Sequence, residues 1–369
     1  MSHEPGDKVE ALLAALHGRR SLLICTHNNP DPDALAAAVG LRLLVTRTQR
    51  MRCRIVYGGI IGRAENRTMM KLLRLGAERF RRSLLRPNPA VALVDTQPGA
   101  RNSPLPDPVI PAVVIDHHRP LRKRTAAAAF ADVRVEYGSS STIVTEYLRG
   151  HKIAIPRMVA TALLYGIQTD TMGLGRGGLQ QDIRAMQYLF PLASLKLLHR
   201  IQNPRIPHEH LFAFADAVRQ ARILRDVLVS HLGPIHSPDV AAEMADFLLR
   251  GEGVHWVLVS GVHEGTLHFS LRTSVRGKQA GSLARRIAGR QDAAGGHDRS
   301  AGGALRIDEH DTPEALEHGL ETRLLHVLGR SGEPHAFRPP GPPARRADRV
   351  TPKPAAKTKA EGVGSKTEP

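Results

Sequence analysis

The sequence predicts an α/β protein in which a doubly wound, mostly parallel sheet is followed by a smaller α+β domain. Apolar runs of strand length alternate with helix-forming segments through the first half of the chain, as they do in doubly wound sheets. The runs contain few polar residues, which is typical of parallel strands that are covered on both faces. With 369 residues, the chain is also long enough for two domains.

The alternation can be followed element by element in the first half. A short amphipathic helix is expected at Val9–His17 and a strand at Ser21–Thr26, and the polar segment HNNPDPD then leads into a helix at residues 34–48. The apolar stretch Thr161–Ile167 is compatible with either a helix or a strand. The other expected elements are strands at Cys53–Tyr57, Ala90–Asp95 and Val113–Asp116, and a helix at Glu65–Leu75.

The pattern changes at residues 201–207, where the sequence IQNPRIP indicates a linker. Helices are expected beyond it at His210–Val229, Asp239–Leu249 and Ser282–Ala288, and residues 254–261 and 265–274 predict a β-hairpin. The expected division is a first domain at residues 1–200, a linker with a connecting helix at 201–224, a second domain at 225–330 and a tail at 331–369. The tail is basic and rich in Pro and Ala, so it is expected to be disordered.

The composition limits the function classes. Lys and Arg outnumber Asp and Glu by 52 to 35, and the formal net charge of +17 favours a polyanionic partner or substrate. Aromatic residues make up only 4% of the chain, which argues against a stacking platform for long single strands. Two cysteines cannot form a disulfide framework, so a cytoplasmic location is expected. No apolar run reaches the length of a membrane-spanning helix, so no membrane partner is expected.

Acidic and imidazole side chains follow the ends of the apolar segments. The carboxyl ends of parallel strands meet at one edge of a sheet, where ligands bind in such folds. Four carboxylates gathered there without a cation would repel one another, whereas two divalent metals sharing one carboxylate would relieve the repulsion. Mixed oxygen and nitrogen ligands suit Mn²⁺, with Mg²⁺ or Co²⁺ as alternatives. The candidate ligands are His27, Asp31, Asp33, Asp95, His117 and Asp170.

Taken singly, each of these acids is explained as well by a helix cap or a turn. The whole set favours a metal site, because HNNPDPDA, VDTQ, IDHH and GIQTD each place an acid just after an apolar segment. Paired divalent ions in such sites activate water against phosphate esters. A two-metal phosphoesterase is therefore the leading interpretation.

These motifs resemble those of the DHH phosphoesterase family, whose name-giving motif stands here as Asp116-His117-His118. The family's first motif is represented by His27-Asn28-Asn29-Pro30-Asp31-Pro32-Asp33-Ala34, and its second and fourth by Asp95 and Asp170. The segment Gly295-Gly296-His297-Asp298-Arg299-Ser300-Ala301-Gly302 resembles the glycine-rich motif of the DHH-associated substrate-binding domain. The resemblance covers about residues 20–325.

The resemblance implies a role for each residue of the set. One metal would be held by His27, Asp31 and Asp95. The other would be held by Asp33, Asp95, His117 and Asp170, with Asp95 bridging the two and a water or hydroxide between the metals as nucleophile. Asp116 would orient a histidine. His118 would face the substrate as a phosphate ligand or as the proton donor to the leaving group.

On the substrate side, the resemblance implies that Arg272 contacts a phosphate or base and that Gly295, Gly296, His297 and Gly302 form a phosphate-binding loop. An ordinary glycine-rich turn and a surface arginine are the simpler alternative. Two departures from the family pattern are Pro32, where many members have glycine, and the interrupted glycine run. Arg63 and Asn66 follow a strand end and are either substrate contacts or the start of a helix.

The two-domain length and the glycine motif resemble most the oligoribonuclease and pAp phosphatase members of the family, where pAp is 3′-phosphoadenosine 5′-phosphate. The expected activity is hydrolysis of short RNA oligonucleotides to 5′-mononucleotides, or removal of the 3′-phosphate of pAp. The alternatives are an exopolyphosphatase, a cyclic- or linear-dinucleotide phosphodiesterase, and a non-catalytic nucleotide or nucleic-acid binding protein. A homodimer is expected from the frequency of two-fold assemblies alone.

Overall fold

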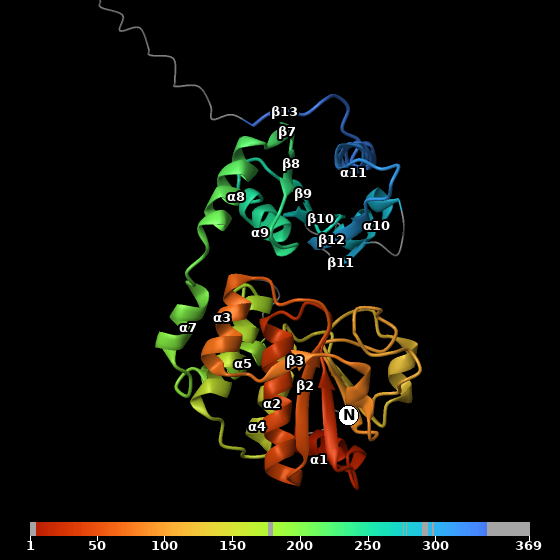
Figure 1. Ribbon diagram of the computed structural model, residues 1–369. Helices are drawn as coiled ribbons and strands as arrows, with labels where there is room; N and C mark the ends of the chain where they lie inside the picture. The colour runs from red at the N-terminus through yellow and green to blue at the C-terminus, as the bar shows by residue number, and fades with distance from the viewer. Residues whose placement is uncertain are drawn as a thin grey trace, which may run out of the picture.

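The computed structural model describes residues 5–175, 180–275, 277, 279–289, 294–296 and 299–337, and the expected tail beyond 337 lies outside them. Two sheets stand one above the other in Figure 1, each with its own helices. The first sheet and its helices consist of α1 (Pro5–Ala15), β1 (Ser21–Cys25), α2 (Pro32–Gln49), β2 (Arg52–Tyr57), α3 (Ala64–Leu73), β3 (Ala77–Arg79), the 3₁₀ helix η1 (Arg82–Leu85), β4 (Ala90–Val94), β5 (Val113–Asp116), the 3₁₀ helix η2 (Lys123–Ala127), β6 (Phe130–Val133), α4 (Ser140–Gly150), α5 (Arg157–Asp170), α6 (Gln180–Leu189) and α7 (Leu195–Gln202).

All pairs in the first sheet are parallel, and the strand order is β3-β2-β1-β4-β5-β6. The chain leaves β1 toward β2 and later returns to place β4 on its other side. This is the order of a doubly wound sheet, and it confirms the predicted fold class. Ligands in such sheets bind where the order reverses, which here is the gap between the carboxyl ends of β1 and β4.

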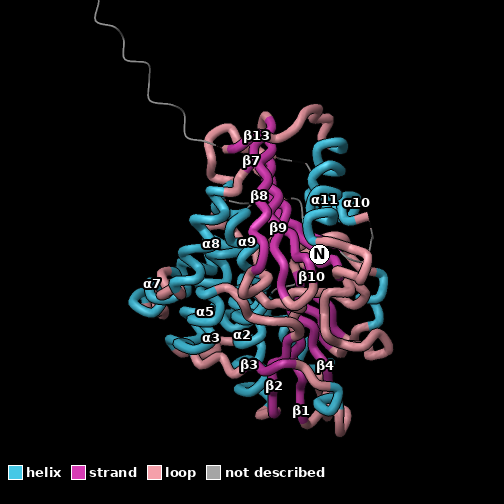
Figure 2. Tube along the Cα trace, turned by 45° about the horizontal axis from the view of Figure 1, so that its top comes forward, coloured by secondary structure: helices cyan, strands magenta, loops and turns pink. Residues whose placement is uncertain are grey.

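Both faces of this sheet are covered, which explains why its strands are apolar throughout. Ile24 and Ala92 belong to the core beneath α2, α4 and α5, and Leu23 and Leu93 face the opposite side. Figure 2 shows α2, α3, α5 and α7 gathered on one side of the strands. The opposite face is covered by loops and short 3₁₀ segments that contribute Phe80, Leu84, Leu85, Leu105 and Val109.

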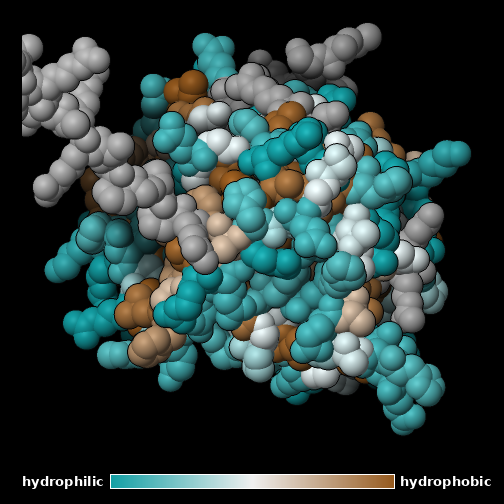
Figure 3. Space-filling model, turned by 90° about the horizontal axis from the view of Figure 1, so that it is seen from above, coloured by the Kyte–Doolittle hydropathy of each residue, from teal (hydrophilic) through white to brown (hydrophobic). Residues whose placement is uncertain are grey.

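The second sheet has the order β11-β12-β10-β9-β8-β7-β13 and is antiparallel except between β8 and β9. It separates two apolar clusters, one packed under α10 and α11 and the other under α8 and α9. Seen from this end, the surface is mainly hydrophilic with scattered apolar residues (Figure 3). Its elements are α8 (His208–Arg219), β7 (Arg222–Leu224), β8 (Val227–Pro234), α9 (Asp239–Leu248), β9 (Trp256–His263), β10 (Thr266–Thr273), α10 (Ala280–Ala288), β11 (Ala294–Gly296), β12 (Ser300–Arg306), α11 (Pro313–Val327) and β13 (His335–Ala336).

The β-hairpin and the helices at residues 239–249 and 282–288 are confirmed, but the helix expected at His210–Val229 is wrong beyond Arg219. Residues 222–229 instead form β7 and the start of β8, paired across a turn in which Arg225 has a φ of 56°. Val227 and Val229 pack into one apolar cluster and Leu228 into the other, so this continuous apolar run is a strand buried on both faces. The second sheet therefore begins within the expected linker at 201–224, and β13 extends it into the expected tail.

Candidate metal centre and substrate side

The loop after β1 brings three candidate ligands to the end of the sheet. Asp31 is the N-cap of α2, and its side chain accepts a hydrogen bond from the Ala34 N–H at 3.0 Å. Pro32 begins the helix, where its missing N–H is no loss, so this departure from the family pattern fits the local structure. Asp31 is thus both a helix cap and a member of the acidic cluster, and the two explanations of the sequence do not compete.

Asp33 belongs to α2, and its side chain contacts the N-terminus of a second helix, α4. Its two carboxylate oxygens accept hydrogen bonds from the backbone N–H groups of Ser140 and Ser141, at 2.7 and 2.9 Å. These groups belong to the first turn of α4, where unpaired donors and the helix dipole favour an anion. Ser139 is the N-cap of α4 and accepts from the Thr142 N–H. The sequence did not indicate that this helix would hold a carboxylate of the site.

Asp95 follows β4 with a φ of 63°, in the left-handed region that non-glycine residues rarely adopt. Its Oδ1 accepts from the Ser140 hydroxyl at 2.8 Å, and its side chain is almost completely buried. A strained backbone at a buried acid is a common feature of functional sites. This conformation turns the carboxylate toward the ends of both β1 and β5.

His27 and His117 both direct the Nε2 atom of the imidazole toward the carboxylates of the cluster. The Nδ1 of His27 lies 2.8 Å from the Asn28 carbonyl oxygen, and that of His117 lies 3.2 Å from the Tyr137 carbonyl oxygen. A carbonyl can only accept, so Nδ1 carries the proton and Nε2 is left for a metal. The Nε2 of His27 lies 3.4 Å from Asp95 Oδ2, and that of His117 lies 3.4 Å from Asp95 Oδ1.

Asp170 is the last residue of α5, so the preceding apolar stretch that was compatible with either element is helical. Its Oδ2 lies 3.0 Å from the Nε2 of His117, and Asp33 Oδ2 lies 4.0 Å from the same nitrogen. The six candidate ligands therefore meet at one place, although they come from distant parts of the chain. Sets that could each hold one ion are His27, Asp31 and Asp95; Asp33, His117 and Asp170; and Asp95, His117 and His118.

The residues present fit a divalent metal. Within the described part of the chain, the buried atoms Asp95 Oδ2 and His117 Nε2 make no hydrogen bond. Buried polar atoms nearly always have partners, and a cation between these groups would supply one. Carboxylate oxygens with two imidazole nitrogens form a donor set suited to Mn²⁺ and related ions, and Asp95 belongs to two of the three sets.

Electrostatics within the cluster are strongly coupled. Burial by itself raises the pKa of the Asp95 carboxyl, but the surrounding imidazoles, that of His117 first, hold this pKa well below its ordinary value. Burial alone would lower the pKa of His27, yet Asp31 and Asp95 raise it well above 6.5. Burial and the nearby carboxylates raise the pKa of Asp33. The metal-free cluster therefore holds protons where the metals would bind.

Asp116 lies at the end of β5 and is completely buried. Its Oδ1 lies 2.8 Å from the Nδ1 of His118, and its Oδ2 accepts from the Gln97 amide at 2.7 Å. Gln97 also donates to the His118 carbonyl oxygen and accepts from the backbone N–H of Arg122. The sequence did not single out Gln97, although it stands two residues after Asp95 in the segment VDTQ.

On the substrate side, the glycines do not form the loop that was expected. Gly295 and Gly296 lie in β11 and Gly302 in β12, with Gly295 opposite Gly302. Glycine at these positions allows close packing of strand and helix, since a Cβ on Gly281 of α10 would lie 2.3 Å from the Gly296 carbonyl oxygen. The role of these glycines in phosphate binding stays a prediction. His297 lies outside the described residues.

Arg272 is on β10 and is mostly buried rather than a surface arginine. Its Nη1 donates to the Ser270 hydroxyl at 2.7 Å and to the Ala301 carbonyl oxygen at 3.0 Å. Its Nε donates to Asp246 of α9 at 2.5 Å. Nη2 donates no hydrogen bond to any residue that the structure describes, and substrate binding by Arg272 stays a prediction.

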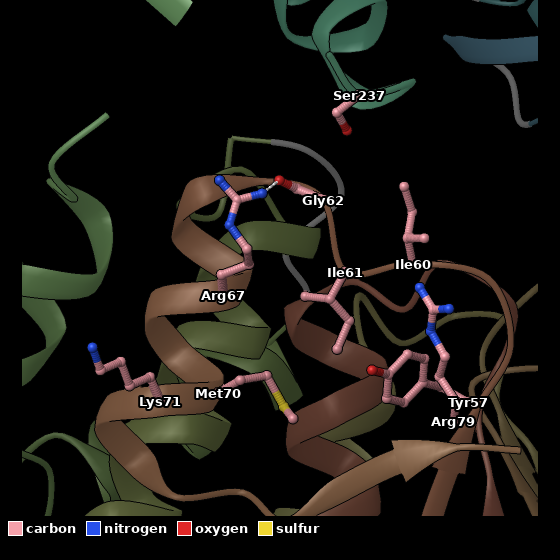
Figure 4. A pocket seen from close by; sticks show the side chains of 9 residues that line it. All are labelled: Tyr57, Ile60, Ile61, Gly62, Arg67, Met70, Lys71, Arg79 and Ser237. Atoms are coloured by element: carbon pink, nitrogen blue, oxygen red, sulfur yellow. Dashed lines mark hydrogen bonds between the residues drawn. The ribbon is translucent and has the colours of Figure 1, made fainter. Parts of the chain in front are cut away.

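Arg63 is the N-cap residue of α3 and also reaches Asp246, at 2.7 Å. Asn66 is buried and donates to the Pro30 carbonyl oxygen, which steadies the loop that carries Asp31. Beside α3 lies a cavity of about 620 Å³, lined by residues of both sheets' domains (Figure 4). Arg67, which lines it, points toward the Gly62 carbonyl oxygen, and Ser237 approaches from the second domain.

Comparison with known proteins agrees with this architecture. Residues 21–167 match the DHH family, N-terminal domain, and residues 225–321 match the DHHA1 domain. The chain belongs to the DHH family. Members of the DHH family are metal-dependent phosphoesterases. Among the described helices, none combines the length and apolar composition that a membrane span requires.

Two relatives illustrate the similarity, and the name of only the second one states an activity. The chain is 32% identical over 316 residues to an uncharacterized protein of Methanocaldococcus jannaschii, covering 84% of this chain and 64% of that protein. It is 25% identical over 276 residues to the cyclic-di-AMP phosphodiesterase GdpP of Geobacillus thermodenitrificans, covering 68% of this chain and 40% of that protein. The chain thus spans less than two thirds of either relative.

Among solved structures, the fold is similar to that of an exopolyphosphatase-related protein from Bacteroides fragilis. The TM-score is 0.68 at 15% sequence identity, and the match covers 88% of this chain and 97% of that one. At this identity the similarity establishes the shared two-domain fold and leaves the substrate open.

Proposed function

We propose that this DHH protein is a two-metal phosphoesterase, with Mn²⁺ as the preferred ion, that hydrolyses short oligoribonucleotides to 5′-mononucleotides or removes the 3′-phosphate of pAp. The observation that carries the proposal is the meeting of all six candidate ligands at the point where the strand order reverses. Two of the buried ligand atoms make no hydrogen bond to the described residues, as expected of atoms that bind a cation.

His27, Asp31 and Asp95 would hold one ion, and Asp33, Asp95, His117 and Asp170 the other, with Asp95 shared. When bound, such a pair of ions supplies Lewis acidity that activates water and stabilises charge on the phosphoryl oxygens. Ser140 fixes Asp95 through its hydroxyl, and the N-terminus of α4 fixes Asp33. These contacts orient the ligands before substrate arrives, so little reorganisation is needed during the reaction.

His118 would donate a proton to the leaving oxygen. Burial by itself lowers the pKa of its imidazole, but the hydrogen bond to Asp116 and the charge of Asp95 raise the pKa above its ordinary value. A raised pKa keeps a larger fraction of the imidazole protonated near neutral pH, as a general acid requires. Asp116 would act by holding the Nδ1–H, so that Nε2 is the atom that faces substrate.

Arg272 would bind a substrate phosphate through its Nη2 edge, since its other donors are held by Ser270, Ala301 and Asp246. A planar guanidinium fixed on one side offers a directed contact for a phosphate oxygen. The net charge of +17 would favour the association of polyanionic substrates in general.

The deciding experiment compares labelled RNA dinucleotide, trinucleotide and 24-mer with pAp, cyclic di-AMP and polyphosphate, each in Mn²⁺ and in EDTA. We expect rapid, EDTA-sensitive loss of the two shortest RNAs or of pAp, with little cleavage of the 24-mer. Cleavage of polyphosphate alone would retain the metal site and overturn the substrate. Binding without turnover, unaffected by EDTA, would identify a nucleotide-binding protein instead.

A further inference from the structure

The two domains meet through charged residues at the start of α3 and along α9. Asp239, Glu243 and Asp246 occur at intervals of four and three residues, so they share one face of α9. The opposite face of this helix packs Val240, Met244 and Leu248 into the second domain. The acidic face is therefore fixed in direction by the core behind it.

Two residues of the first domain, Gly62 and Arg63, contact this acidic face of α9. A Cβ on Gly62 would lie 1.3 Å from the Asp239 Oδ2, so the Asp239 side chain of α9 packs directly against the Gly62 backbone. The next residue, Arg63, donates through Nη2 to Asp246 Oδ2 at 2.7 Å. The contact thus couples the loop after β2 to a helix of the other domain at two points, two helical turns apart.

Asp246 has a second partner on its other oxygen. Its Oδ1 accepts from the Nε of Arg272 at 2.5 Å, and Arg272 is the arginine proposed to bind the substrate phosphate. Although burial raises the pKa of a carboxyl, Arg272 and Arg63 hold the pKa of Asp246 below its ordinary value. The Asp246 carboxylate is therefore shared between two guanidiniums, one from each domain.

We propose that Asp246 is a positioning residue: by holding Arg63 of the catalytic domain and Arg272 of the substrate domain on its two oxygens, it fixes how far the bound phosphate lies from the metal centre. This inference rests on the proposed function, because Arg272 matters here as a phosphate contact. Without the carboxylate, the two guanidiniums would repel and the domains would lose a fixed separation. Misplacement by about 1 Å can reduce a reaction rate by about 100-fold.

The test compares Asp246→Asn, Asp246→Glu and the control Asp216→Asn on two substrates. Asp216 pairs with Arg219 on the exposed side of α8, so its variant removes a carboxylate of the same domain without touching the contact. The substrates are the RNA dinucleotide and bis(p-nitrophenyl) phosphate, a small diester that needs the metal centre but has no second phosphate for Arg272. KM and kcat are measured for each, with the thermal unfolding temperature.

We expect Asp246→Asn to lower kcat/KM for the dinucleotide by about 10-fold or more and to leave hydrolysis of the small diester within about two-fold of wild type. Asp246→Glu should recover part of the activity on the dinucleotide, and Asp216→Asn should match wild type. An unchanged kcat/KM for the dinucleotide would overturn the proposal. Equal loss on both substrates with a lower unfolding temperature would also overturn it, because that pattern indicates a purely structural role.

A further measurement separates this proposal from the proposed function. The unfolding free energies of wild type, Arg63→Gln, Asp246→Asn and the double variant form a double-mutant cycle that needs no substrate. Coupling between the two residues is expected even if no nucleotide is cleaved. If the wild type cleaves no nucleotide, the proposed function fails and Asp246 has no substrate to position. Energetic coupling between Arg63 and Asp246 would then support only the contact between the domains. If no coupling is measured, that contact is refuted as well.

Discussion

Replacing Asp116 with asparagine tests how the name-giving motif works. Asp116 accepts two hydrogen bonds, from His118 Nδ1 at 2.8 Å and from Gln97 Nε2 at 2.7 Å. Gln97 cannot rotate its amide to adapt, because its Oε1 already accepts from the Arg122 N–H and the Thr125 hydroxyl. An introduced amide must therefore point its NH₂ group at a donor on one side or the other.

Each arrangement has a calculable effect. If the NH₂ group faces Gln97, two buried donors oppose each other, which costs about 1–3 kcal/mol of stability. If it faces His118, the imidazole must give up its Nδ1 proton and can no longer hold Nε2 ready as an acid. Losing a carboxylate that orients a site histidine typically reduces activity by about 10–100-fold, or about 1.4–2.7 kcal/mol in the barrier.

The assay is kcat/KM on an RNA dinucleotide in Mn²⁺ across pH 6 to 10, with chemical unfolding measured alongside. Because the Asp116 hydrogen bond raises the pKa of His118, removing its charge should move the alkaline limb of the profile to lower pH. Asp107→Asn, which alters an exposed carboxylate paired with Arg124, serves as the control. A variant that keeps more than half of the wild-type activity, with an unshifted profile, would refute the reasoning.

Three further predictions concern the ligands and the substrate side. Asp95→Ala should abolish nearly all activity and reduce the bound Mn²⁺, since in the proposed site this carboxylate is common to both ions; wild-type turnover in excess metal would contradict the assignment. The pKa values of His27 and His117 in the folded chain lie above their ordinary value of about 6.5. These two groups therefore stabilise the metal-free protein below about pH 6.5, and this stabilisation is lost as the pH rises through their folded-state pKa values. Metal binding should accordingly release protons, seen by calorimetry in buffers of different ionisation enthalpy, and pH-independent affinity would count against it. Gly281→Ala should displace β11, destabilise the chain by about 1–3 kcal/mol and raise KM for the dinucleotide; an unchanged KM would show that β11 does not contact substrate.

The α/β class, the helices and strands that alternate in the first half, and the identity of the candidate ligands could all be predicted from the amino-acid sequence. This was possible because buried parallel strands are apolar on both faces, and because a metal site needs acid and imidazole ligands, which here follow the ends of β1, β4 and β5. Asp31 illustrates how local the signal is: the same short segment encodes the end of β1, the cap of α2 and a candidate ligand.

The tertiary structure alone decided how those residues are held. Ser140 and Ser141 meet Asp33 across more than a hundred residues of chain, and no local pattern encodes a pairing at that separation. The same holds for Asp246, whose partners Arg63 and Arg272 come from different domains. Short-range patterning reports which face of an element is apolar, whereas contacts between elements depend on how the whole chain packs, and the orientation of this site is made of such contacts.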